Sequence, residues 1–324
     1  MQTSMNCITA EERDFFEEHG YLILPGIFGP ETVAAVTQIV DAMVAMARTT
    51  GLPDGERMHV NDILSRRCLE LGPSDFIKSG QRFVLDLACH DRMLPKIWGI
   101  LGWHIALIES QLSVVPPGPK VGAPEGPYAW HQDGGYANQG YQNHRATDYE
   151  PPLMPRLSMK AAVYFSDTRE PDCGQMWVIP GSHRSVNLMP QYTPTLSPEL
   201  LERAIPLRAS PGSVVLHDRR TWHGISANKS QTTRKIIFLN YGYRWLERLD
   251  EMDVEHLLGD DLSPVAKQLL RTIEGGPLSP APDSVPLYRY IVERMDAEAL
   301  QSLCPRKPAR ALWNTVDGLP LSAR

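Results

Sequence analysis

Three residues of the chain, His131, Asp133 and His223, carry side chains that bind divalent transition metals. His131 and Asp133 stand two positions apart in the run WHQDGG at 130–135, so on a β-strand both would point to the same face. His223 follows much later, in the run WHGISAN at 222–228. Two imidazoles and one carboxylate leave three adjacent positions of an octahedral ion open, which is the facial triad of non-haem Fe(II) oxygenases.

Arg234 follows His223 and opens the next predicted strand. If a short turn through 227–233 returns the chain, the guanidinium lies near His223. A guanidinium binds a carboxylate through two parallel hydrogen bonds. A 2-oxo acid that chelates the iron would need such an anchor at its far end. We therefore expect the open metal positions to take a bidentate co-substrate and O₂.

Each of these features has an ordinary structural interpretation when it stands alone. A short H-x-D run arises by chance, as a surface histidine beside a loop aspartate. His223 alone would suit a hydrogen-bonded histidine at a strand end, and Arg234 alone a surface ion pair. The metal site is favoured because the residues occur together and in this order.

The elements that must position these residues change in character along the chain. Residues 1–104 are predicted to be largely helical, with a capping box formed by Thr9 and Glu12. A second helix should begin near Pro30, and a third should span 91–101.

Residues 105–246 are predicted to form the β core. Short strands alternate there with turn signals, and apolar side chains alternate in the run LSMKAAVYF at 157–165. Residues 247–324 return to a helical pattern, with a helix start at Ser263. We expect one catalytic domain over 1–324, mainly β with flanking helices.

The composition excludes several classes of protein. Hydrophobic residues make up 42% and charged residues 22% of the chain, which suits a folded protein with a sizeable core. The net charge of −6 argues against nucleic-acid binding, which normally shows a basic excess. No apolar run reaches the roughly 18 residues of a membrane span, and no secretory signal is visible. The five scattered cysteines suit the reducing cytoplasm.

The sequence resembles the phytanoyl-CoA dioxygenase family of Fe(II)/2-oxoglutarate-dependent oxygenases. The resemblance rests on WHQDGG at 130–135, WHGISANKSQTTRK at 222–235, PGSHR at 180–184 and FFEEHGYLILPGIF at 15–28. It implies a double-stranded β-helix, the jelly-roll core of the cupin kind.

The same resemblance implies roles for particular residues. His131, Asp133 and His223 would bind the iron, and Arg234 the distal carboxylate of 2-oxoglutarate. The implied reaction oxidises a small organic metabolite, most often by hydroxylation, with succinate and CO₂ as co-products. Asp133 also argues against a halogenase, because halogenases of this superfamily replace that carboxylate with Ala or Gly.

One position departs from the family pattern. Many members carry Ser or Thr two residues after the distal histidine, whereas this chain has Ile225 there, followed by Ser226. Ser226 would help to bind 2-oxoglutarate only if the strand register shifts. Gln111, on a predicted strand before the metal motif, is a further candidate for the co-substrate site, with an edge-strand glutamine as the alternative.

The long loop at 134–156 should help to shape a substrate pocket. Its candidate substrate-binding residues are Tyr136, Gln139 and Tyr141, and an ordinary surface excursion is the alternative for each. Two other functions remain open on the same fold. One is a metal-dependent cupin isomerase or epimerase that needs no 2-oxoglutarate, and the other is a non-catalytic binding protein. The oligomeric state is left open by the sequence.

Overall fold

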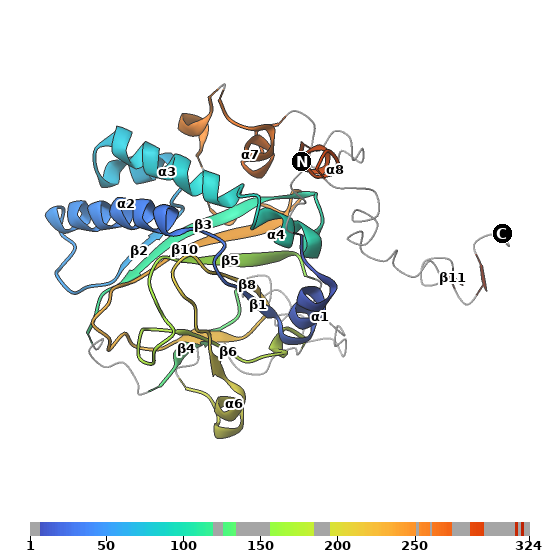
Figure 1. The fold of residues 1–324 in the computed structure, drawn as a ribbon, viewed down its shortest axis with the longest axis horizontal. Coiled ribbons are helices and arrows are strands. Elements are labelled where there is room, and N and C mark those ends of the chain that lie inside the picture. Colours follow the sequence, from blue (N-terminus) through green and yellow to red (C-terminus); the bar gives the residue numbers. More distant parts are fainter. Residues whose placement is uncertain are drawn as a thin grey trace, which may run out of the picture.

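The computed structural model describes residues 7–118, 126–133, 156–184, 195–250, 253–259, 261–273 and 286–294, together with the backbone at 315–316 and 319–320. Two antiparallel sheets face each other, and helices cover the outer face of the larger one (Figure 1). The fold class predicted from the sequence, mainly β with flanking helices, is confirmed.

The larger sheet has six strands in the order β1-β8-β5-β10-β3-β2. Their bounds are β1 Tyr21–Leu24, β2 Met58–Asn61, β3 Ile105–Val115, β5 Ser158–Tyr164, β8 Val214–Asp218 and β10 Arg234–Tyr243. All neighbouring strands in it run antiparallel. The segment 1–104, expected to be largely helical, also supplies both edge strands of this sheet, β1 and β2.

The smaller sheet has four strands in the order β4-β9-β6-β7. Their bounds are β4 Tyr128–His131, β6 Met176–Val178, β7 Ile205–Pro206 and β9 His223–Ile225. Its first two strands contain both predicted histidine ligands, so this sheet is the one that builds the site.

Helices pack on the sheet from both ends of the chain. α1 (Ala10–His19) begins with the predicted capping box of Thr9 and Glu12. α2 (Pro30–Thr49) begins at the predicted proline, and α4 (Leu94–Leu101) begins three residues later than expected. α3 (Ser74–Ala88) was not predicted, and it packs beside α2 over the sheet (Figure 1).

Shorter elements complete the described part of the chain. They are α6 Pro198–Arg203, α7 Pro264–Leu269, α8 Pro286–Val292, the 3₁₀ turns Arg66–Leu71, Ser182–Arg184 and Glu255–Leu257, and the hairpin strands β11 Thr315–Val316 and β12 Leu319–Pro320. Ser263 caps α7 as expected. Among the described helices, none combines the length and apolar character that a membrane crossing requires.

The alternation along β5 separates the core from the site. Met159, Ala161 and Val163 face the helices and join the main hydrophobic core. Lys160 and Ala162 point the other way because successive side chains of a strand alternate between faces. A cavity of about 450 Å³ lies on this inner side, lined by residues of both sheets.

Candidate functional site

His131, Asp133 and His223 come together at the cavity wall. Their candidate ligand atoms all lie within 4.8 Å of one another. The Nε2 atoms of His131 and His223 each lie 3.8 Å from a carboxylate oxygen of Asp133. The two imidazole rings stand 4.2 Å apart between centroids. Two imidazoles and one carboxylate around a common point are the donor set of a facial metal site.

The pairing of β4 with β9 places the two histidines side by side. His131 lies opposite His223, and the register shifts between Tyr128 and His131. Ala129, inside this irregularity, has a φ of 55°, which is uncommon for a residue with a side chain. Irregularities of this kind re-aim side chains next to functional sites. Here the irregularity turns His131 toward the cavity.

Main-chain carbonyl groups fix the orientation of both rings. Nδ1 of His131 lies 2.7 Å from the carbonyl oxygen of Ala129, and Nδ1 of His223 lies 3.0 Å from that of Thr221. With Nδ1 donating to a carbonyl, the Nε2 lone pair is directed at the metal position, which is how metal-binding histidines are usually held. Burial keeps the pKa of His223 well below its usual range, so this ring is neutral and able to bind a metal.

Lys160 supplies the positive charge beside Asp133. Its Nζ lies 2.7 Å from the Oδ2 atom of Asp133. Burial opposes ionisation of this carboxyl group, but Lys160 and the more distant Arg219 hold its pKa well below the usual range. Asp133 is therefore a carboxylate at neutral pH. Neutral imidazoles with an ionised carboxylate fit a divalent cation at this point.

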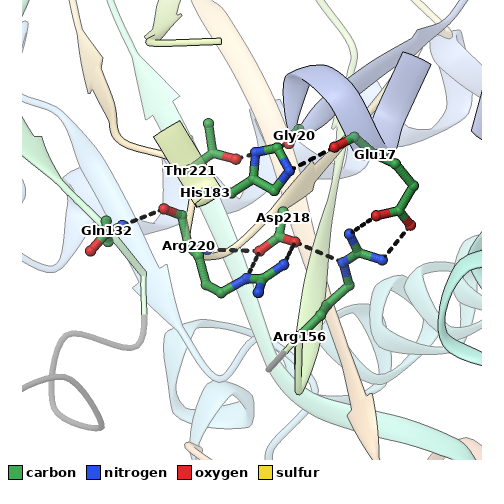
Figure 2. A network of polar contacts seen from close by, with 8 residues as sticks. All are labelled: Glu17, Gly20, Gln132, Arg156, His183, Asp218, Arg220 and Thr221. Atoms are coloured by element: carbon green, nitrogen blue, oxygen red, sulfur yellow. Dashed lines mark hydrogen bonds and ion pairs between the residues drawn. The ribbon is translucent and has the colours of Figure 1, made fainter. Parts of the chain in front are cut away.

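A polar network behind the site holds the two ligand segments together (Figure 2). Asp218, at the end of β8, accepts hydrogen bonds from Arg156 at 2.7 Å and from Arg220 at 2.8 Å. Arg156 also forms a two-pronged ion pair with Glu17 of α1. Gln132, which stands between two candidate metal ligands, donates a hydrogen bond to the carbonyl oxygen of Arg220. The H-x-D run is thereby fastened to the turn that leads into His223.

Arg234 lies at the other side of the same cavity. It is only 3% exposed, and its guanidinium donates to the carbonyl oxygen of Gly174 and, at 3.2 Å, to Oγ of Ser113. Burial lowers its pKa to about 10, so it remains cationic at neutral pH. A buried guanidinium facing the metal ligands across a cavity suits a carboxylate bound between them.

The phytanoyl-CoA dioxygenase family model matches residues 16–236, well over half of the chain. The chain belongs to the phytanoyl-CoA dioxygenase family. The family predicted from the motifs is confirmed, and the match covers all four residues of the predicted metal and co-substrate site. A search of curated proteins gives no match.

Solved structures of low sequence identity share the fold. HygX from Streptomyces hygroscopicus, with nickel and 2-oxoglutarate bound, is 17% identical with a TM-score of 0.54, over 78% of this chain and 94% of HygX. The carbocyclase SnoK from nogalamycin biosynthesis is 19% identical with a TM-score of 0.51, over 79% of this chain and 92% of SnoK. The epimerase SnoN, in complex with Fe³⁺, alpha-ketoglutarate and nogalamycin RO, is 18% identical with a TM-score of 0.50, over 72% and 82%.

Family membership and the donor set agree on the class of enzyme. This family member is an iron- and 2-oxoglutarate-dependent oxygenase with a jelly-roll core. The predicted cofactors, Fe(II) with 2-oxoglutarate and O₂, fit the residues at the site.

The other sequence-predicted residues fall in three places. Gln111 lines the cavity and donates to Glu109 at 2.7 Å. Ser226 lies off this cavity, in a separate hollow, with its Oγ 3.4 Å from the carbonyl oxygen of Gln175. The strand register thus brings Ile225, and not Ser226, to the cavity wall. Tyr136, Gln139 and Tyr141 lie outside the described residues.

Several residues that line the cavity were not predicted from the sequence. Lys160, Glu109 and Arg219 line the cavity together with the candidate metal ligands. His217 lies there too, with its ring centroid 5.1 Å from that of His223. Burial lowers its pKa to about 4, and neither ring nitrogen has a hydrogen-bond partner among the described residues. The signal for Lys160 was a charged residue within an apolar strand.

Proposed function

We propose that this enzyme hydroxylates a small organic molecule, consuming 2-oxoglutarate and O₂ and releasing succinate and CO₂. The observation that carries the proposal is that Arg234 lines the same cavity as the three clustered ligand atoms. An isomerase that needs no 2-oxoglutarate would have no use for a buried guanidinium at that place. Its partner is a small molecule, and we propose that it works in the cytoplasm without nucleic acid.

His131, Asp133 and His223 would hold the iron. Bound iron, with 2-oxoglutarate and O₂, supplies the oxidising power for attack on a substrate C–H bond. The carbonyl oxygens of Ala129 and Thr221 keep the two imidazoles aimed, and Lys160 keeps Asp133 ionised. These contacts prepare the site before any ligand arrives.

Arg234 would bind the distal carboxylate of 2-oxoglutarate, and Ser113 would orient it. Ser113 is fully buried and touches the guanidinium directly. The hydroxyl group that the family pattern places after the distal histidine is thus supplied here from β3. Gln111, which precedes Ser113 on the same strand, would form part of the wall of the co-substrate pocket.

The test is an anaerobic titration of metal-free protein with Fe(II) and 2-oxoglutarate. We expect a saturable metal-to-ligand charge-transfer band, near one iron per chain, that is lost in Asp133→Ala. Iron binding without the band would contradict the proposal. It would favour the hypothesis of an isomerase or of a binding protein. Aerobic incubation with candidate metabolites then measures succinate formation. The fold also carries a carbocyclase and an epimerase, so the product must be identified as well.

A further inference from the structure

Arg219 is a buried cation in the cavity, and it has no role in the proposed metal site or in the proposed co-substrate site. It lies in the turn after β8, is 6% exposed and lines the cavity with the metal ligands. Its Nε and Nη1 atoms have no hydrogen-bond partner among the described residues. Buried N–H groups are nearly always satisfied, so these two call for an acceptor that no described residue provides.

The neighbouring arginine shows what a structural role would look like. Arg220 donates to Asp218 through Nε at 2.8 Å and Nη2 at 2.5 Å, and it holds the turn. Within the described part of the chain, Arg219 forms only an ion pair, with Nη2 3.5 Å from Oε2 of Glu109. That distance is longer than a hydrogen bond, and it leaves the other edge of the guanidinium for a ligand.

Glu109, on β3, is the acidic partner of Arg219 at the cavity wall. Its Oε1 accepts a hydrogen bond from Gln111 at 2.7 Å, while its Oε2 is buried without a hydrogen bond from any described residue. Arg219 and Glu109 therefore form a loosely paired couple, and the guanidinium lies near enough to Asp133 to help lower the pKa of that carboxyl group. A ligand can enter between them without first breaking a tight structural contact.

The balance of charge favours an anion. Among the described residues, four cationic side chains line the cavity, against two acidic ones. The cations are Arg57, Lys160, Arg219 and Arg234, and the acids are Glu109 and Asp133. A divalent iron and a dianionic 2-oxoglutarate cancel each other, so the loaded cavity keeps a positive excess. A substrate oxyanion would offset it and would supply the missing acceptor.

We infer that Arg219 binds an oxyanion of the substrate, either a carboxylate or a phosphate group, on the Asp133 side of the metal centre. This inference rests on the proposed function, because it assigns Arg234 to the co-substrate and Arg219 to the substrate. The negative charge of Glu109 repels the anion and so lowers its affinity. The enzyme would thus select acidic small molecules despite its net negative charge.

The experiment measures anion binding directly, without turnover. Protein loaded with Mn(II) and 2-oxoglutarate is titrated at constant ionic strength with inorganic phosphate or acetate. Paramagnetic relaxation of the phosphorus or methyl-proton signal reports each dissociation constant. The variants are Arg219→Gln, Glu109→Gln and, as a matched surface control, Arg169→Gln, whose side chain is 62% exposed.

We expect Arg219→Gln to weaken binding by about tenfold or more, as loss of a charged hydrogen bond does. Glu109→Gln should strengthen binding, and Arg169→Gln should leave it unchanged. Tighter binding of phosphate would point to a phosphate ester, and tighter binding of acetate to a carboxylic acid. Equal affinity in Arg219→Gln and the parent would overturn the inference. Such a result is what direct binding of the anion to the metal would give.

Failure of the proposed function would look different. The Fe(II)–2-oxoglutarate band would then be missing in the parent, while phosphate binding to metal-free protein would still depend on Arg219. If Arg219→Gln does not fold, the opposite change in Glu109→Gln carries the test, and unchanged or weaker binding there would contradict the inference.

Discussion

The ammonium group of Lys160 lies 2.7 Å from Oδ2 of Asp133, inside the ring of candidate metal ligands. Both side chains are nearly buried, at 7% and 12% exposure. Without metal, Lys160 is therefore the main partner of this carboxylate. In the absence of metal, the carboxylate among the candidate ligands is thus paired with a protein cation.

This pairing predicts a specific pattern of stability. Asp133→Ala should destabilise the metal-free protein by about 3–5 kcal/mol, because it leaves the Lys160 ammonium buried without its partner. Adding Lys160→Met should restore most of that loss. Urea unfolding of the three metal-free proteins measures the effect. Equal stabilities for the single and double variants would show that the two charges are not coupled.

The anchor of Gln132 on Arg220 should control iron affinity. Gln132→Ala keeps all three ligands but frees the segment between His131 and Asp133, so we expect iron to bind about 10–100-fold more weakly. Competition with a chelator under anaerobic conditions gives the affinity. Gln175→Ala, which removes another buried amide donor to main-chain carbonyls, is the matched control and should retain the parent's affinity. A similar loss in both variants would mean that general loosening, not the anchor, is responsible.

Two serines separate the alternatives for the 2-oxoglutarate site. Ser113→Ala should raise the 2-oxoglutarate concentration needed for half-saturation by several-fold to about tenfold, since one hydrogen bond that orients Arg234 is lost. Ser226→Ala should leave it unchanged, because this hydroxyl lies off the cavity. Titration of the charge-transfer band measures both. The reverse order of effects would support the register shift considered from the sequence.

Asp218 should make the fold sensitive to acid. Burial opposes its ionisation, but Arg220 and Arg156 lower its pKa from 3.8 to about 2. Its stabilising contribution, about 2 kcal/mol, is complete above pH 4 and is lost as the pH falls toward 2. Unfolding measured between pH 2 and 7 should show this loss in the parent but not in Asp218→Asn. The surface variant Asp167→Asn should keep the parent's pH profile to within the small contribution of an exposed pair.

The part of the site that could be predicted is the part carried by short motifs. His131, Asp133, His223 and Arg234, predicted from residue type and order, line one cavity in the structure. The β core was predictable because alternation in 157–165 is a local signal. α3 was missed because its first two turns mix Ser, Asp, Lys and Gly with the apolar residues.

The remaining lining residues depend on pairing between strands. Lys160 lies opposite His217 on one side and Asn240 on the other, and this register brings a lysine under a motif far away in sequence. Ser113 reaches Arg234 from β3 in the same manner, because Arg234 lies opposite Val115. The sequence of one strand does not specify which strands pair with it. The motifs therefore could not predict these contacts.

The network of Figure 2 also has a consequence for the order in which the enzyme matures. Glu17, Arg156 and Asp218 come from three distant stretches of chain, and only their meeting fixes the turn to which Gln132 is tied. A growing polypeptide that has been synthesised to just beyond Asp133 therefore contains two of the candidate ligands but not the complete metal site. The candidate metal site is thus complete only when the strand that bears His223 and the first helix have both taken their places in the fold.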